Sequence, residues 1–186
     1  GPLWVVRVLV EAGARGAEAT GEGTTPLIMA AQNGHLEVVR ALVEAGASVD
    51  QVREGGATPL FKAAQNGRCE MVRVLVDAGA SVGQATENGN TPLIVAAGNG
   101  HLEVVHALVK AGGAIVNQTG NKGGTALFMA AQQGRYEMVR ALVAAGASVD
   151  QAREDGGTPL FISAQEGYLG VVHALVAPGA GGDQAP

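Results

Sequence analysis

The chain has 186 residues, of which 47% are hydrophobic and 16% charged, and its formal net charge is −5. The high apolar fraction excludes a disordered chain. The acidic balance argues against nucleic acids and anionic membrane surfaces as partners, because both are bound by clusters of Lys and Arg.

Nothing in the sequence indicates a membrane span or an export signal. No apolar run is long enough to cross a bilayer, and no signal peptide is visible. Cys69 is the single cysteine, so it can form neither an internal disulfide nor a zinc site of the usual ligand spacing. We therefore expect an intracellular protein, with the cytoplasm as the default compartment.

The first predicted element is one amphipathic helix within Leu3–Ala14, whose apolar residues recur at helical spacing. It follows Gly1-Pro2, which resembles a protease scar. It matches only the second helix of the units that follow, so its apolar residues around Trp4 lack partners. Two interpretations stay open: the chain is a fragment of a longer array, or the end Leu3–Leu9 associates with another copy.

The next predicted element is a short helix that begins after Thr25. The hydroxyl of Thr25 can accept a hydrogen bond from the first turn, and Pro26 suits the first helical position because no N–H is needed there. Asn33-Gly34 is predicted to end the helix, with Gly34 in the left-handed conformation of a C-cap. Its apolar side consists of Leu27, Ala30 and Ala31.

A second helix is predicted over Leu36–Ala45, with apolar residues at helical spacing. Glu37, Arg40 and Glu44 lie on its other side, where residues three and four apart can form weak ion pairs. Gly46 is predicted to cap this helix. Residues 47–57 are rich in Gly and polar residues and are predicted to form an extended loop with a turn.

This pattern of two helices and a loop recurs along the chain. Equivalent threonines stand at Thr25, Thr58, Thr91, Thr125 and Thr158, so the spacings are 33, 33, 34 and 33 residues. A period in this range is typical of a stacked array rather than of a globule with a single core. A lone unit buries too little apolar surface to offset its ordering entropy, so stacking on neighbours must supply the rest.

The unit Thr25–Ala47 resembles the ankyrin repeat through TPL, the double alanine, GHLEVV, LV and AGA. The motifs recur from Thr58, Thr91, Thr125 and Thr158, and the resemblance covers about Leu3 to Ala180. It implies an all-α ankyrin-repeat solenoid, in which stacked helix-turn-helix units are joined by β-hairpin-like loops. One departure is that apolar residues replace the family's histidine after TPL, at Ile28, Phe61, Ile94, Phe128 and Phe161.

The repeats divide the chain into one array over residues 1–186. Residues 1–19 are predicted to be a partial repeat, and residues 20–52, 53–85, 86–119 and 120–152 full repeats; Gly112-Gly113 adds one residue to the loop of the third. Residues 153–180 form a degraded terminal repeat, because Gly170 replaces the usual Glu and Pro178 interrupts the AGA motif. Residues 181–186 are a tail.

No motif predicts catalysis, a metal site or a cofactor. His35 and His101 follow a helix-ending glycine, and the resemblance implies that each bonds the neighbouring turn. His106 and His173 are predicted to be solvated, and Cys69 to be a small packing residue because it aligns with leucines. The Gly-rich loops lack P-loop spacing, and nothing desolvates the pair Glu154-Asp155 at a loop tip. We therefore expect no enzyme activity in this chain.

The remaining function is binding, and the resemblance implies that loop tips and first helices form one concave partner surface. From the loops the candidates are Glu22, Thr24, Arg53, Glu54, Ala57, Glu87, Asn88, Asn90, Asn121, Lys122, Glu154 and Asp155. From the first helices they are Met29, Gln32, Asn33, Lys62, Gln65, Asn66, Val95, Asn99, Met129, Gln132, Gln133, Ile162, Gln165 and Glu166.

An apolar strip rimmed by amides is a plausible surface for a protein or peptide, and the acidic loop tips weakly favour a basic partner. Arg135, Tyr136 and Tyr168 form a second-choice surface. Asn117 corresponds only loosely to the family's asparaginyl-hydroxylase target. Three alternatives stay open: a structural spacer within a larger protein, self-association, and an enzymatic activity that resides in another domain.

Overall fold

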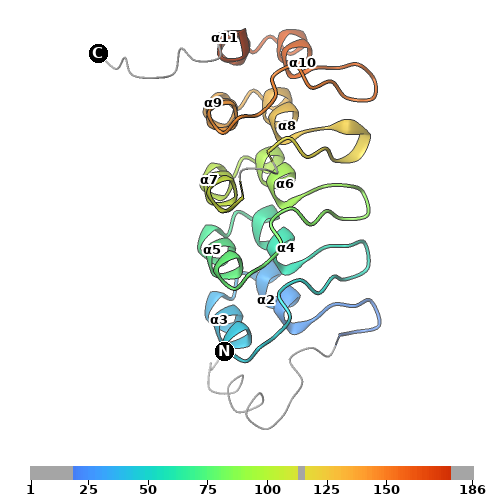
Figure 1. Cartoon of the computed structure of the whole chain (residues 1–186), viewed down its shortest axis with the longest axis vertical. Helices are drawn as coiled ribbons and strands as arrows, with labels where there is room; N and C mark the ends of the chain where they lie inside the picture. The colour runs from blue at the N-terminus through green and yellow to red at the C-terminus, as the bar shows by residue number, and fades with distance from the viewer. Residues whose placement is uncertain (1–18, 113–115, 177–186) are drawn as a thin grey trace, which may run out of the picture.

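The computed structural model describes residues 19–112 and 116–176, which contain ten α-helices and no strand. They form five consecutive pairs (Figure 1). The pairs are α2 (Pro26–Asn33) with α3 (Leu36–Glu44), α4 (Pro59–Gln65) with α5 (Cys69–Asp77), α6 (Pro92–Asn99) with α7 (Leu102–Ala111), α8 (Ala126–Gln132) with α9 (Tyr136–Ala144), and α10 (Pro159–Gln165) with α11 (Leu169–Val176). A 3₁₀ turn, η2 (Asn121–Gly123), lies in the loop before α8.

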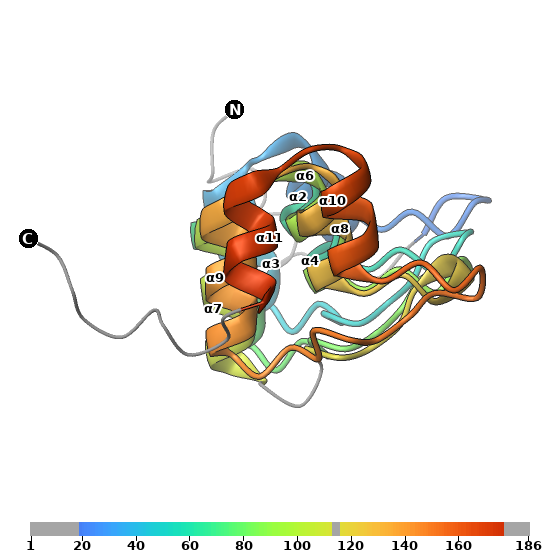
Figure 2. The same cartoon turned by 90° about the horizontal axis from the view of Figure 1, so that it is seen from above.

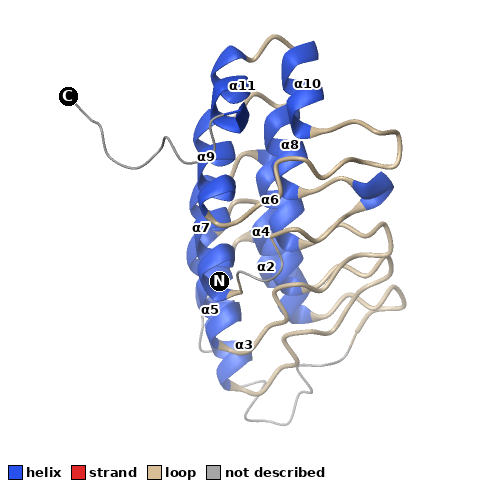
Figure 3. Ribbon diagram, turned by 45° about the horizontal axis from the view of Figure 1, so that its top comes forward, coloured by secondary structure: helices blue, strands red, loops and turns tan. Residues whose placement is uncertain are grey.

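The pairs stack into two columns of helices. The first helices α2, α4, α6, α8 and α10 pack on one another in that order, and the second helices form a parallel column beside them. The loops project from the side of the first helices, which therefore lie between the loops and the second helices (Figures 1 and 2). Figure 3 shows the same layering with the loops separated from the helices by colour. The predicted all-α solenoid is confirmed.

The hydrophobic core runs between the columns for the whole length of the stack. Each of the first four first helices contributes a double alanine, which lets the neighbouring helix approach closely, and a fully buried leucine. The second helices contribute valines and leucines at helical spacing. The first-helix leucines are Leu27, Leu60, Leu93 and Leu127. Because this core is continuous, each unit depends on its neighbours for burial.

The threonine before each first helix is an N-cap, as the sequence predicts. The hydroxyls of Thr25, Thr58, Thr91, Thr125 and Thr158 each accept a hydrogen bond from the backbone N–H three residues on, at 3.0–3.2 Å. Thr91 is fully buried, so water cannot replace its hydroxyl if that hydroxyl is removed.

Thr91→Ala is therefore expected to lower the free energy of unfolding by about 1 kcal/mol, within the range of about 0.5–2 kcal/mol for lost N-caps. Thr91→Ser keeps the capping oxygen and is expected to cost less. Urea denaturation followed by circular dichroism measures both changes. Equal losses in the two variants would show that burial of the methyl group, rather than the cap, carries the effect.

The turn between the two helices of a unit is closed by a glycine. Gly34 and Gly100 have φ of 83° and 86°, in the left-handed region that the sequence predicts for Gly34. The residue after the equivalent glycine of the next unit packs over this turn: a Cβ built on Gly67 would lie 2.6 Å from Nδ1 of His101. Glycine is thus required both for its φ and for this close approach.

The loops turn back on themselves as a hairpin does. In each, a backbone N–H donates to the carbonyl four residues on, as from Arg53 to Ala57 at 3.1 Å. Neighbouring loops are also joined, because the N–H of Glu54 donates to the carbonyl of Glu22 at 2.9 Å, and that of Glu154 to Lys122 at 3.1 Å. Lys122 takes a φ of 55° within the 3₁₀ turn. The predicted hairpin-like loops are therefore present and stacked.

The apolar residues that replace the family's histidine are buried in four units. Ile28, Phe61, Ile94 and Phe128 are all buried. Phe161 differs, with 61% of its surface exposed, because no described residue forms a unit beyond it. In the inner units the apolar side chain has thus become part of the interface between repeats.

Several predictions fall outside the described residues. They are the partial repeat up to residue 18, with its segment Leu3–Leu9, the end of the degraded repeat after Val176, and the tail at residues 181–186. The proposed repeat boundaries stay predictions. Within residues 19–112 and 116–176, no helix combines the length and the apolarity that crossing a membrane requires.

Candidate protein-interaction surface

Equivalent residues of the five first helices form a strip that we call the helix column. Met29 is 44% exposed, and the other four are half-buried. Met129 lies close to the preceding unit, because its Cε is 3.4 Å from a Cβ built on Gly98. The members of the helix column are Met29, Lys62, Val95, Met129 and Ile162.

Lys62 is the charged member of the helix column. Its ammonium donates a hydrogen bond to Oε1 of Gln65 at 3.1 Å and lies 6.0 Å from the centre of the Phe61 ring. Partial burial, and then the neighbouring positive charge of Arg53, hold the pKa of Lys62 below its usual value. Both causes disfavour the charged form of Lys62.

The glutamines of the first helices form an amide row beside the helix column. Gln32 and Gln165 are exposed, whereas Gln65 and Gln132 are half-buried. The contact between Gln65 and Lys62 shows that the amide row and the helix column share one side of α4. Amide groups at this place can donate to and accept from a partner's backbone.

The polar residues that follow the amide row hold the stack together. Nδ2 of Asn66 donates to the carbonyl of Gln32 at 3.2 Å, and Nδ2 of Asn99 donates to the carbonyl of Gln65 at 2.9 Å. The Nδ2 groups of Asn66 and Asn99 therefore bridge successive units. Both residues are exposed, so their side-chain oxygens remain accessible to a partner. The equivalent positions in the other units, all exposed, are Asn33, Gln133 and Glu166.

The loop tips present most of the predicted loop candidates, both charged residues and asparagines. The exposed ones are Glu22, Glu54, Glu87, Asn88, Asn121, Lys122, Glu154 and Asp155, and Arg53 and Asn90 are half-buried. Two candidates must be corrected: Thr24 is only 9% exposed and Ala57 is also buried. The backbone carbonyl of each closes the hairpin-like turn, which directs both residues into the stack.

Arg153 is a loop residue that the sequence analysis missed. Its guanidinium lies 4.9 Å from the centre of the Phe128 ring and 3.4 Å from Oδ2 of Asp155. It therefore links the last described loop to the preceding unit and partly neutralises one tip carboxylate. The signal that could have found it is the phenylalanine that replaces the family's histidine, because this ring offers a face to a cation.

Two of the three second-choice residues belong to the stacking contacts. Nη2 of Arg135 donates to the carbonyl of Gly98 at 3.3 Å, and the ring of Tyr168 lies over Gly134. His101 at the equivalent position bonds the carbonyl of Gln65 through Nε2 at 3.1 Å, which confirms its predicted structural role. Tyr136 remains exposed on α9.

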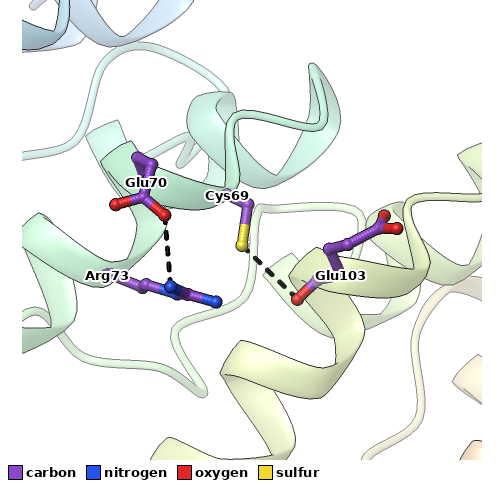
Figure 4. Close-up of polar contacts among 4 residues, drawn as sticks. All are labelled: Cys69, Glu70, Arg73 and Glu103. Carbon is purple, nitrogen blue, oxygen red and sulfur yellow. Dashed lines mark hydrogen bonds and ion pairs between the residues drawn. The ribbon is translucent and has the colours of Figure 1, made fainter.

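Cys69 packs between units, as its alignment with leucines predicts. It is half-buried beside the core, and its Sγ lies 3.6 Å from the carbonyl oxygen of Glu103 in the next unit (Figure 4). The same close-up shows an exposed ion pair of 3.1 Å between Arg73 and Glu70, equivalent to the predicted pair of Arg40 with Glu37 at 3.7 Å. These exposed pairs contribute little stability.

Asn117 is held by the loop of the next unit. Its Nδ2 donates to the carbonyl of Gly146 at 3.1 Å, and its Oδ1 accepts from the N–H of Ser148 at 2.7 Å. Asp50 makes the equivalent contact with Ser81. Both side chains therefore join successive units. In the described part of the chain, no group of three or more His, Cys, Asp or Glu could hold a metal ion.

Helix-turn-helix units in two columns, joined by stacked loops, define a repeat solenoid with a continuous surface on its loop side. A family model described as ankyrin repeats (3 copies) matches residues 1–86, 50–119, 79–153 and 113–184. The chain belongs to the ankyrin repeat family, whose members generally serve as protein–protein interaction modules and are generally non-catalytic. A search of curated proteins finds no match.

Proposed function

We propose that this chain is a non-catalytic scaffold that binds a protein or peptide partner. The partner lies on the helix column, the amide row and the loop tips, which together we call the inner surface. This surface corresponds to the concave face that the family resemblance implies. The observation that carries the proposal is the exposure of Met29 in a strip that is apolar except for Lys62 and that lies beside amides and charged tips, an arrangement typical of protein interfaces.

The inner surface is ordered before any partner binds. Each first helix is capped by a threonine hydroxyl, and backbone hydrogen bonds join the tips of neighbouring loops. A rigid surface loses little conformational entropy on association. Binding affinity therefore comes from complementarity to a preformed surface rather than from folding upon binding.

The charge of the loop tips weakly favours a partner with basic residues. Exposed carboxylates stand at Glu22, Glu54, Glu87 and Glu154, so basic residues of a partner are favoured there. Such rim charges act mainly on the association rate and weaken as salt is raised. The apolar helix column supplies the larger part of the binding free energy.

The test compares partner capture by the wild-type chain and by Met29→Glu/Met129→Glu, which places two carboxylates on the helix column. We expect the double variant to lose at least about 10-fold in affinity for a captured protein, because the new charges are desolvated on binding. Ala144→Glu is the matched control, since Ala144 is exposed on α9 and glutamate occupies the equivalent position 44. Undiminished capture by the double variant would assign binding to another surface.

Self-association is a second candidate because of a different observation. Phe161, Leu169 and Val176 are more than half exposed at the end of the described stack. In the inner units, the residues equivalent to Phe161 are buried by the next repeat, so a second copy or a further repeat fits this face. Sedimentation equilibrium separates the candidates, since a scaffold of the kind proposed above remains a monomer.

A further inference from the structure

Lys62 on the helix column and Arg53 on the neighbouring loop are two positive charges that form no ion pair with a described carboxylate. Four arginines in the described residues form ion pairs within 4.0 Å, namely Arg40, Arg73, Arg140 and Arg153. Neither Lys62 nor Arg53 forms such an ion pair. Arg53 is half-buried on the loop that precedes α4, so it stands on the loop side of the inner surface and Lys62 on the helix side.

The surroundings of Lys62 make its ammonium receptive to an anion. Its charge is opposed by partial burial and by Arg53, which hold its pKa below the usual value. The groups that compensate are neutral: the amide oxygen of Gln65 at 3.1 Å and the ring of Phe61 at 6.0 Å. A partner carboxylate beside Lys62 would form a charge-assisted hydrogen bond and would offset the repulsion from Arg53.

We propose that the partner of the inner surface presents an aspartate or glutamate to Lys62 and Arg53, between two apolar side chains that pack on Met29 and Val95. The inference rests on the proposed function and specifies the partner's chemistry. The acidic residue of the partner lies over the helix column, whereas the loop tips weakly favour basic residues. Basic residues of the same partner face the tips.

The stacking distance predicts the spacing within the partner segment. Packed helices lie about 8–10 Å apart, and an extended chain rises about 3.3 Å per residue. A segment that runs along the stack in extended form therefore advances by about three residues for each unit. We expect apolar residues about three positions before and after the acidic residue, one above Met29 and one above Val95.

A peptide-display experiment tests this pattern. A library of random 12-residue peptides on phage is selected on the wild-type chain, on Lys62→Glu and on the control Lys110→Glu, which changes an exposed lysine at the end of α7. We expect the wild type and the control to enrich Asp or Glu between apolar residues. Lys62→Glu is expected to enrich Lys or Arg there and to bind the wild-type peptides at least about 10-fold more weakly.

The outcomes separate the inference from the proposed function. Peptides that lose binding to Met29→Glu/Met129→Glu but carry no acidic residue at a fixed position would overturn the inference and leave the proposed function standing. If no peptide is enriched, or if enriched peptides bind that double variant undiminished, the proposed function fails, and the inference fails with it. Lys62→Gln, which removes the charge with little change in size, repeats the affinity measurement if Lys62→Glu does not fold.

Discussion

Leu93→Ala is expected to lower the free energy of unfolding by about 2–5 kcal/mol, the usual cost of truncating a fully buried leucine. Leu93 lies on α6 in the middle unit and is 1% exposed. Both neighbouring first helices pack against α6, so the cavity cannot close without moving three units. Urea denaturation followed by circular dichroism measures the loss.

The position of Leu93 in the stack adds a second expected result. Repeat stability is roughly a sum of unit and nearest-neighbour contributions, so a weak middle unit separates the two halves. We expect the unfolding transition of Leu93→Ala to broaden or to split. Val95→Ala on the same helix is the matched control, because Val95 is half-buried on the helix column and should cost less than about 1.5 kcal/mol. Equal losses for the two variants would contradict the continuous core.

Local chemistry explains why most of the fold was predictable from the sequence. Thr-Pro starts a helix and Asn-Gly ends it through contacts within a few residues. These two signals therefore predict the helix Pro26–Asn33 correctly. The second helix was predicted over Leu36–Ala45 and spans Leu36–Glu44. The predicted and observed ends differ by one residue. The carbonyls of the last turn accept hydrogen bonds from the N–H groups of Ala45, Gly46 and Ala47, so the last helical residue can be assigned at more than one position.

Apart from the bond of His101 to the preceding turn, which the family resemblance implies, sequence reasoning missed the polar contacts between units. The bond of Asp50 to Ser81 and that of Asn117 to Ser148 each join residues 31 positions apart. No local pattern predicts such a pair, because its geometry depends on how one repeat settles on the next. Thr24 has a local reason instead, because its carbonyl closes the hairpin-like turn with Thr20 and the residue is buried.

Repetition of a residue in several units does not by itself distinguish a role in binding from a role in stacking. The recurrence of Asn66 and Asn99 could indicate either a binding row or a copied scaffold, and their bonds to the preceding unit explain it by stacking. Two members of the helix column are different, because Met29 is exposed and Lys62 donates its hydrogen bond to Gln65 of its own unit. For that reason the proposals above depend on the helix column rather than on the amides.

Gly67→Ala is expected to lower the free energy of unfolding by about 1.5–3.5 kcal/mol, more than Gly79→Ala in the same unit. Both glycines have positive φ, 68° and 89°, which costs a residue with a Cβ about 1–2 kcal/mol. Gly79 has nothing within 4 Å of a built Cβ, whereas Gly67 faces the ring of His101. Gly79→Ala should therefore show the conformational cost alone. In Gly67→Ala the ring must also move, and its bond to Gln65, worth about 0.5–1.5 kcal/mol, is lost.

The histidine itself supplies the control for this pair. His101→Ala removes the ring, so Gly67→Ala made in that background should cost only what Gly79→Ala costs. The coupling between the two positions, measured by a double-mutant cycle of urea denaturations, is expected to be at least about 1 kcal/mol. Additive losses would mean that the ring does not restrain Gly67, and that positive φ alone selects glycine at the turn. A measured coupling would show that each turn is held by the unit that stacks on it, which explains why Arg68, Arg135 and Tyr168 occupy the same position over other glycines.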